Sequence, residues 1–520
     1  MPWGTGYDRS TCICDETMNS KNVLTNLVSS IVLQFVTALS GLILPHFFIL
    51  CYGSAINGMV SSITQFLSYL ALVEAGISAA AIVELYKPLE RNDEDERNRV
   101  LSAARKFYLQ SGVLYLLLLT GLLLVYPIII GDQVDRLTTV LMILVLAGSN
   151  LIDYFILGKY RVLLSADQKI SVLNNIQSVG TVLNVIVSIV LMLCRCNVVL
   201  VKFAATFIYA CRAIFVIAYV KVHYRNVRFD VETPKDALPQ RWNALFHQIV
   251  GVVCNNTDLI LITVCMGSRS LFEASVYYVY NLAASMFTSL ANSLSSAITP
   301  SFGKQLASGQ KAALKELFDN FEFFYFILIF TVYTCMYNLL LPFVSIYTAS
   351  VEDAVYFRPG LAVLFTVMGL IQNIRIPSLS MICAAGHYKQ TQWRAFAEAV
   401  INLTVSVLLI FRLGIAGAVI GTICSYGYRS IDSILYNRRF FDHDVVRVSF
   451  LRLVRNAFTM ALLCFAIRKA DLRISSWGSF FAWGMLLLAV CLVLFLLMNY
   501  CFEHQKMKDH YMQLSRIRRK

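Results

Sequence analysis

The sequence predicts an all-α polytopic membrane protein of about fourteen transmembrane helices, arranged as two pseudo-symmetric six-helix lobes and a C-terminal helix pair. Three observations predict this fold class. Of the 520 residues, 58% are hydrophobic and only 14% are charged, whereas a soluble globular chain carries about 25% charged residues. The apolar residues come in blocks of about 20, long enough to cross roughly 30 Å of hydrocarbon. Basic residues gather in alternate loops, as expected for loops on the cytoplasmic side.

The apolar segments, taken in chain order, define the expected spans. They lie near 23–45, 55–83, 107–130, 137–158, 172–194, 198–221, 243–267, 271–299, 321–346, 356–381, 393–411, 414–436, 449–467 and 477–500. The loops after the second, sixth and twelfth spans and the C-terminal tail are rich in Lys and Arg, while the intervening loops carry few. We therefore predict that both termini are cytoplasmic.

An internal repeat divides most of the spans into two lobes, because polar residues of the sixth span recur in the twelfth at a displacement of 217 residues. The matching pairs are Tyr209 and Tyr426, Arg212 and Arg429, and Tyr219 and Tyr436, with Asn184 and Asn402 matching one residue further along. Duplicated lobes are typical of transporters, whose sites lie between the repeats near the membrane midplane.

The repeat and the loop charges give the expected domain limits. We predict a cytoplasmic tail at 1–22, an N-lobe at 23–222, a cytoplasmic linker at 223–242, a C-lobe at 243–437, helices 13 and 14 at 438–500, and a basic cytoplasmic tail at 501–520. Residues 1–17 are expected to be an extension ahead of a natural start at Met18.

Several function classes are disfavoured by the sequence. No P-loop, G-x-S-x-G or H-E-x-x-H pattern occurs, and no long extracytoplasmic loop could house a catalytic domain. We therefore expect no enzymatic activity. The net charge of +13 is explained by cytoplasmic loops, so we expect no nucleic-acid partner. Most cysteines lie in apolar spans and are expected to pack as small hydrophobic residues, so no metal site is predicted.

Ionisable residues at membrane depth carry most of the functional information, since each is costly if it faces lipid. Arg212 and Arg375 are expected to face a cavity, and Arg375 precedes Pro377, where the helix should break or end. Arg429 is spaced i, i+3 from Asp432, so cavity-facing function and mutual neutralisation both remain open for it. Glu398 is expected to be structural or interfacial.

Polar stripes indicate either a wet cavity or helix–helix packing. Gln34 belongs to a stripe in the first span, and Asn255 and Asp258 belong to one in the seventh. Gln65 belongs to a polar run in the second span that leads to Glu74. A carboxylate at membrane depth favours the cavity interpretation.

Longer motifs resemble those of one transporter family. They are Tyr52-Gly53 followed by Asn57-Gly58, Leu72-Val73-Glu74-Ala75-Gly76, Asn255-Asn256-Thr257-Asp258, Ala385-Gly386-His387-Tyr388-Lys389 and Tyr428-Arg429-Ser430-Ile431-Asp432. In order and spacing, from about residue 18 to 440, the chain resembles Wzx-type polysaccharide flippases of the multidrug/oligosaccharidyl-lipid/polysaccharide (MOP) exporter superfamily.

The resemblance implies that the chain flips polyprenyl-pyrophosphate-linked oligosaccharide units across the bacterial cytoplasmic membrane by alternating access, for export of O-antigen, capsule or exopolysaccharide. Membrane lipids, a polysaccharide polymerase and glycosyltransferases are the implied partners, and the chain is expected to function as a monomer. The alternatives are a lipid II flippase, a cation-coupled multidrug antiporter of the same superfamily and, less favoured, a membrane glycosyltransferase or polymerase.

The flippase function that the resemblance implies gives each candidate site residue a role. Arg212, Arg375 and Arg429 would bind the pyrophosphate, because guanidinium groups form bidentate hydrogen bonds with phosphate oxygens. The sugar-binding and cavity residues would be Gln34, Gln65, Asn255, Tyr277 and Asn281. No cofactor is expected beyond a coupled H⁺ or Na⁺, for which Glu74 and Asp258 are the candidate ligands.

Overall fold

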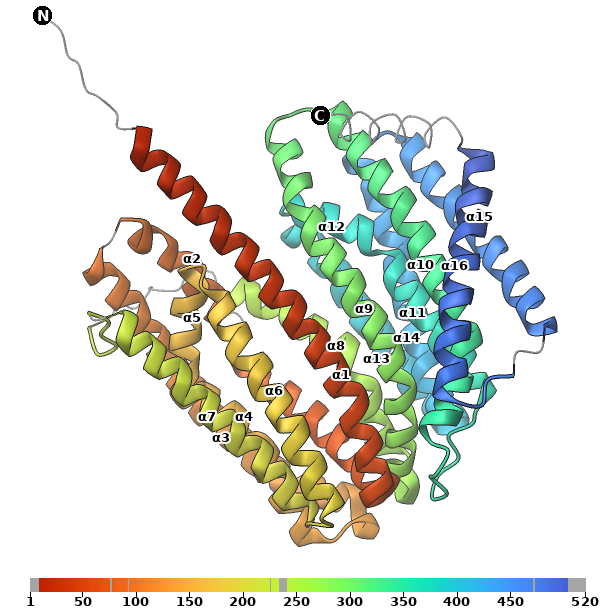
Figure 1. Ribbon diagram of the computed structural model, residues 1–520, viewed down its shortest axis with the longest axis horizontal. Helices are drawn as coiled ribbons and strands as arrows, with labels where there is room; N and C mark the ends of the chain where they lie inside the picture. The colour runs from red at the N-terminus through yellow and green to blue at the C-terminus, as the bar shows by residue number, and fades with distance from the viewer. Residues whose placement is uncertain are drawn as a thin grey trace, which may run out of the picture. The chain divides into compact units, whose positions relative to one another are not determined.

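The computed structural model describes residues 9–74, 77–91, 93–224, 226–232, 241–470 and 473–503, with side chains except at 9–24, 77, 79, 241–250, 254, 255 and 290. These ranges are almost entirely helical and contain no strand (Figure 1). They form 14 long helices. Within them, 10 helical segments are long and apolar enough to cross a membrane. The predicted all-α polytopic membrane fold is therefore confirmed.

The chain divides into two compact units. Unit 1 comprises Met1–Asn256 and Gly267–Leu271, and unit 2 comprises Thr257–Met266 and Phe272–Lys520. The division falls inside helix α8 (Arg241–Cys265). The predicted limits of the N-lobe and C-lobe stay predictions.

Several of the helices in unit 1 pack against helices that are not their neighbours in the sequence. Its helices are α1 (Arg9–Leu70), α2 (Ile77–Glu90), α3 (Glu94–Ile130), α4 (Arg136–Ile152), α5 (Gly158–Ala166), α6 (Ile170–Leu193) and α7 (Val198–His223). Helix α6 packs against both α1 and α7, and α7 also packs against α4 (Figure 1). Helix α7 therefore contacts both α4 and α6.

Three backbone irregularities interrupt the passes of unit 1. Gly53 has φ 83° and ψ 171°, which breaks α1 into two passes, and glycine adopts this positive φ without a Cβ clash. A 3₁₀ turn at Ala71–Glu74 interrupts the second pass. A π-helical turn at Asp153–Leu157 separates α4 from α5, and such turns occur frequently at functional sites.

Unit 2 is organised around α10 and α14. Its helices are the last part of α8, α9 (Ser270–Ala307), α10 (Lys311–Tyr347), α11 (Pro359–Ile374), α12 (Ile376–Ala384), α13 (Tyr388–Leu413), α14 (Ile415–Tyr436), α15 (His443–Lys469) and α16 (Trp477–Phe502). Helix α10 packs against α11, α15 and α16, while α14 packs against α11 and α13. The predicted break before Pro377 is confirmed, because α11 ends and α12 begins at Arg375.

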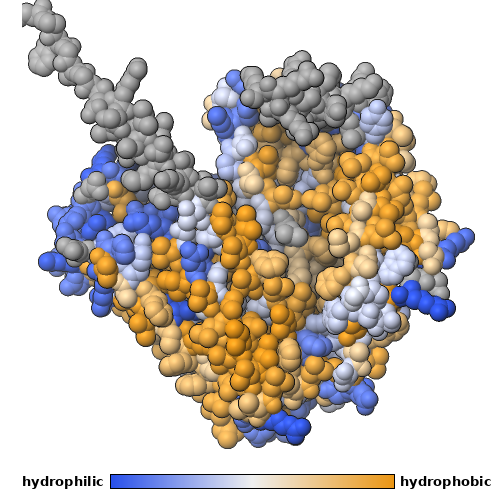
Figure 2. Space-filling view, in the orientation of Figure 1, coloured by the Kyte–Doolittle hydropathy of each residue, from blue (hydrophilic) through white to orange (hydrophobic). Residues whose placement is uncertain are grey.

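The lateral faces of the helices expose large apolar side chains. Ile128 is 79% exposed and Met485 is 75% exposed. Figure 2 shows hydrophobic residues covering the long helices and hydrophilic residues gathered at helix ends. Such continuous apolar surface is matched by lipid rather than by water.

Candidate functional site

A cavity of about 210 Å³ lies inside unit 1, between α4, α6 and α7. Its polar lining residues come from all three helices. They are Ser149 of α4, Thr181 and Asn184 of α6, and Lys202, Thr206, Tyr209 and Arg212 of α7. The residues that line this cavity include two cations and no carboxylate. The cavity therefore offers a positively charged, hydrogen-bonding environment within membrane-spanning helices.

Arg212 is held in this cavity by close packing. Its Cδ occupies the space beside Gly180, where an added Cβ would lie only 2.1 Å away. Its guanidinium carbon lies 4.8 Å from the centre of the Tyr209 ring. A glycine at 180 is thus required for the arginine to reach its position.

Lys202 supplies the second cation. Its Nζ lies 4.1 Å from the centre of the Phe48 ring. Because α7 begins at Val198 and a helix rises 1.5 Å per residue, Lys202 lies roughly 15 Å from the level of Arg212, nearer the start of α7. Among the described residues, neither cation forms an ion pair.

The neighbouring carboxylate of Asp153 is already compensated. Arg161 Nη2 lies 2.7 Å from Asp153 Oδ1, and the Tyr209 hydroxyl donates a 2.6 Å hydrogen bond to the same oxygen. Arg161 also donates to the Tyr209 hydroxyl at 3.2 Å. The carboxylate at the π-helical turn is thus paired with Arg161, whereas Arg212 forms no ion pair among the described residues.

A second polar cluster lies inside unit 2 and has the opposite character. Asp258 is buried, and its carboxylate accepts hydrogen bonds from Thr422 Oγ1, at 2.8 and 2.7 Å, and from the Tyr277 hydroxyl, at 3.1 Å. Asn402 Nδ2 donates to Thr422 Oγ1 at 2.9 Å. In the part of the chain that the structure describes, the buried Oδ1 of Asn402 has no hydrogen-bond partner, and no cation pairs with Asp258.

This cluster is suited to hold a proton or a hard cation. A buried, unpaired carboxylate is costly and is relieved by protonation or by a bound ion. Carboxylate, amide and hydroxyl oxygens are the ligands that hard cations prefer. Asp258 supplies the carboxylate, Thr422 supplies the hydroxyl, and Asn402 supplies the amide oxygen that has no partner among the described residues.

Arg375 and Arg429 lie together in a charge network of unit 2. Glu398 pairs with Arg375 and, at 3.6 Å, with Arg429 Nε. Asp432 pairs with Arg429 Nη1 at 2.9 Å and also with Arg394. Three guanidinium groups thus share two carboxylates, which leaves one positive charge in excess. The sequence left open whether Arg429 and Asp432 neutralise one another, and the structure shows that they form an ion pair.

The remaining predicted residues are spread over both units. Gln34 is exposed on α1, and Gln65 is half-buried with a buried Oε1 that has no partner among the described residues. Glu74 is half-buried at the end of the 3₁₀ turn, and Asn281 is half-buried on α9. The side chain of Asn255 lies outside the described residues.

Asn26 and Ser30 precede Gln34 at spacings of four residues on the same face of α1, and both make packing contacts. Asn26 donates to the carbonyl oxygen of Gln168 at 2.7 Å and accepts from the backbone of Ser171 at 2.8 Å. Asn174 of α6 donates to Ser30 at 3.0 Å. These residues join α1 to the segment that begins α6, whereas Gln34 is exposed.

Sequence reasoning missed several members of these clusters, among them Lys202, Asn402, Arg161 and Thr422. Lys202 could have been found as an intramembrane lysine, and Asn402 was noted only as a repeat partner of Asn184. Arg161 and Thr422 carried no usable signal, because nothing in a single sequence tells which side of a helix faces a polar neighbour.

Comparison with known proteins relates the fold to solved transporters. No protein-family model matches the sequence, and no curated protein sequence matches it. A lipid II flippase MurJ in an inward closed conformation has a TM-score of 0.62 at 12% sequence identity, covering 93% of this chain and 100% of that chain. An inward-facing multidrug resistance MATE family transporter of the MOP superfamily has a TM-score of 0.57 at 16% identity, covering 78% of this chain and 93% of that chain. The chain thus has the fold seen in these two transporters.

Proposed function

We propose that this chain is a flippase that moves a lipid-linked oligosaccharide bearing a pyrophosphate across the membrane by alternating access. The observation that carries the proposal is the cavity of unit 1, whose lining residues include Lys202 and Arg212 and no carboxylate. A guanidinium group binds phosphate oxygens through two parallel hydrogen bonds. The polar residues Asn184, Thr206 and Ser149 add hydrogen-bonding groups.

The charge of this cavity favours an anionic substrate over a cationic drug. An amphipathic cation would be repelled by Arg212 and Lys202, and burial within membrane helices strengthens that repulsion. A headgroup with two negative charges moving outward runs downhill in an inside-negative membrane by roughly 4.6 kcal/mol per 100 mV. The membrane potential alone therefore supplies a driving force in this direction.

The environment of Asp258 favours a second driving force, the coupled movement of Na⁺ or H⁺. The cluster of Asp258, Asn402 and Thr422 offers oxygen ligands without a counter-cation. We propose that it binds Na⁺ or H⁺ during the cycle. Surface-polysaccharide units and lipid II share the lipid pyrophosphate, so a lipid II flippase remains the second candidate. The likeness in fold to the MurJ structure covers 100% of that chain, and it supports the lipid II candidate.

The proposal extends to location and partners. A polyprenyl-pyrophosphate glycan is made at the bacterial cytoplasmic membrane, which we propose as the site of action. Glycosyltransferases would supply the substrate, and a polymerase would consume it. The chain would work as a monomer, because both ion-binding clusters are complete within one copy.

Binding of the substrate class tests the proposed anion site. We expect a purified polyprenyl-pyrophosphate oligosaccharide to raise the melting temperature of the full chain in detergent. Arg212→Gln and Lys202→Gln should each weaken this binding by roughly tenfold or more, because each removes a charge-assisted hydrogen bond of about 1.5–3 kcal/mol.

Lys221→Gln is the matched control. Lys221 lies on the same helix, is exposed in its last turn and does not line the cavity. Its substitution should leave binding unchanged. Unaltered binding in both the Arg212 and Lys202 variants would overturn the proposed anion site, as would tighter binding of an amphipathic cation than of the pyrophosphate lipid.

A further inference from the structure

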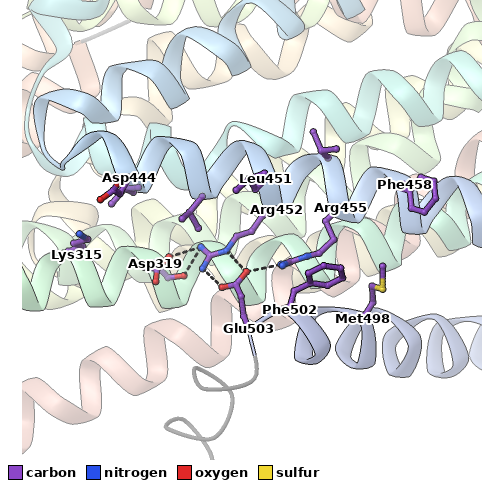
Figure 3. Close-up of a pocket in the computed structure, with 13 residues that line it drawn as sticks. Lys315, Asp319, Asp444, Leu451, Arg452, Arg455, Phe458, Met498, Phe502 and Glu503 are labelled. Carbon is purple, nitrogen blue, oxygen red and sulfur yellow. Dashed lines mark hydrogen bonds and ion pairs between the residues drawn. The ribbon is translucent and has the colours of Figure 1, made fainter.

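A larger cavity, of about 950 Å³, lies in unit 2 between α10, α15 and α16 (Figure 3). Helices α15 and α16 both pack on α10. We call this cavity the α15 groove, since residues of α15 line most of its length. The groove does not include any residue of the clusters described above.

The α15 groove has an exposed apolar wall. Leu451 and Phe458 are each 59% exposed, and Phe502 of α16 is 64% exposed. Leu451 and Phe458 are seven residues apart, so they lie on one face of α15, about two helical turns apart. In a bilayer this wall contacts hydrocarbon chains rather than headgroups.

An ionic network lies in the middle of the groove, between Leu451 and Phe458 along α15 (Figure 3). Arg452, whose side chain is only 2% exposed, pairs with Asp319 at 2.6 Å, Glu322 at 3.2 Å and Glu503 at 2.6 Å. Arg455 pairs with Glu503 at 2.8 Å (Figure 3). Burial raises the pKa of Glu503, but hydrogen bonds and charges from Arg452 and Arg455 outweigh it and hold the pKa below its usual range. This network is internally compensated and fixes α15 to α10 and to the end of α16.

Two charged groups near the N-terminal end of α15 remain accessible (Figure 3). Asp444, in the first turn of α15, is exposed and forms no ion pair with the described residues. Lys315 of α10 lies 3.7 Å from Asp442, with side chains 45% and 83% exposed. Such an exposed pair is weak. The groove thus presents one available carboxylate and one readily available ammonium beside an apolar wall.

We propose that the α15 groove binds a zwitterionic phospholipid with a primary ammonium headgroup, phosphatidylethanolamine. The lipid ammonium donates hydrogen bonds to Asp444, the lipid phosphate accepts from Lys315, and one acyl chain lies along Leu451 and Phe458. An anionic lipid without an ammonium group cannot pair with Asp444 and would place its net negative charge beside that exposed carboxylate. A trimethylated choline headgroup cannot donate a hydrogen bond to Asp444. This site is independent of the substrate proposed above.

Native mass spectrometry of the full chain in detergent tests the site. Phosphatidylethanolamine, phosphatidylcholine and phosphatidylglycerol with identical acyl chains are added in turn. We expect phosphatidylethanolamine to bind most tightly. Asp444→Asn and Lys315→Gln should each weaken its binding roughly fivefold to tenfold, the loss of one partly exposed charge-assisted hydrogen bond.

Asp95→Asn is the matched control, since it makes the same chemical change at an exposed side chain in the first turn of α3 that does not line the groove. It should not weaken lipid binding. Equal affinity for the three lipids, or unchanged binding in Asp444→Asn, would overturn the proposal. Lipid binding that appears only after truncation beyond Glu503 would also overturn it, because the chain's own C-terminal residues would then be the occupant.

Discussion

At the scale of single residues, two membrane-depth carboxylates differ in how their charge is compensated. Asp153 in unit 1 pairs with Arg161 at 2.7 Å. Asp258 in unit 2 has only neutral partners among the described residues, the hydroxyls of Thr422 and Tyr277. An uncompensated buried charge favours uptake of a cation or a proton. Asp258 is therefore the residue at which an ion should act.

Asp258→Asn tests this difference. Asparagine keeps the size of the side chain and can still accept from Thr422, so we expect the protein to fold. The wild type should melt at a higher temperature in Na⁺ than in an equal concentration of choline, or should respond to pH, and this response should disappear in the variant. Asp153→Asn should lower the free energy of unfolding by roughly 1–3 kcal/mol, and with it the melting temperature, yet keep the ion response. An unchanged ion response in Asp258→Asn would remove the proposed role.

The sequence predicted only part of this cluster. Asp258 stood out because a carboxylate at membrane depth is rare, and Tyr277 was assigned to sugar binding rather than to Asp258. Thr422 lies 164 residues from Asp258, and its hydroxyl resembles many others in apolar helices. Only the packing of α8 with α14 selects it.

At the scale of helices, glycines decide where passes bend and how closely they approach. Gly53 adopts a positive φ that divides α1. Five residues further along, Gly58 packs against the start of α9, where an added Cβ would lie 1.8 Å from the carbonyl oxygen of Leu271. A backbone atom cannot move aside as a flexible side chain can. The second pass of unit 1 therefore depends on this close contact.

Gly58→Ala should destabilise the protein by about 1–3 kcal/mol or more, the range for overpacking in a well-packed interior. Thermal unfolding in detergent measures the change. Gly41→Ala on the same helix is the control, because no atom lies within 4 Å of an added Cβ there. Equal stability of the two variants would contradict the close packing of α1 on Leu271.

Helix number was predictable, whereas only one of the helix interruptions was. Each span's apolar length is a local property of the chain, so the count of about fourteen could be derived from hydropathy and loop charge. The break at Arg375 followed from Pro377. The 3₁₀ turn at Ala71–Glu74 and the π-helical turn at Asp153–Leu157 contain no proline. They depend on partners such as Ser111, which donates to the Val73 carbonyl oxygen at 3.1 Å.

At the scale of the whole molecule, repeat-related positions carry different charge environments. Arg212 faces a cavity without carboxylates in unit 1, whereas its repeat partner Arg429 is paired with Glu398 and Asp432 in unit 2. Asn184 lines the cationic cavity, and its repeat partner Asn402 belongs to the Asp258 cluster. A duplicated scaffold would thus provide an anion site in one unit and a cation site in the other. We infer that the two units divide the tasks of substrate binding and ion binding.

Flipping by the purified chain in liposomes tests the central claim most directly. We expect the full chain to move a fluorescent polyprenyl-pyrophosphate oligosaccharide between leaflets, faster with an inside-negative potential, and not to move the same glycan on an uncharged lipid. Arg212→Gln should reduce the rate by roughly tenfold or more, while Lys221→Gln should match the wild type. Equal rates for the charged and uncharged lipids, or no movement of the pyrophosphate lipid by an intact, folded chain, would contradict the account.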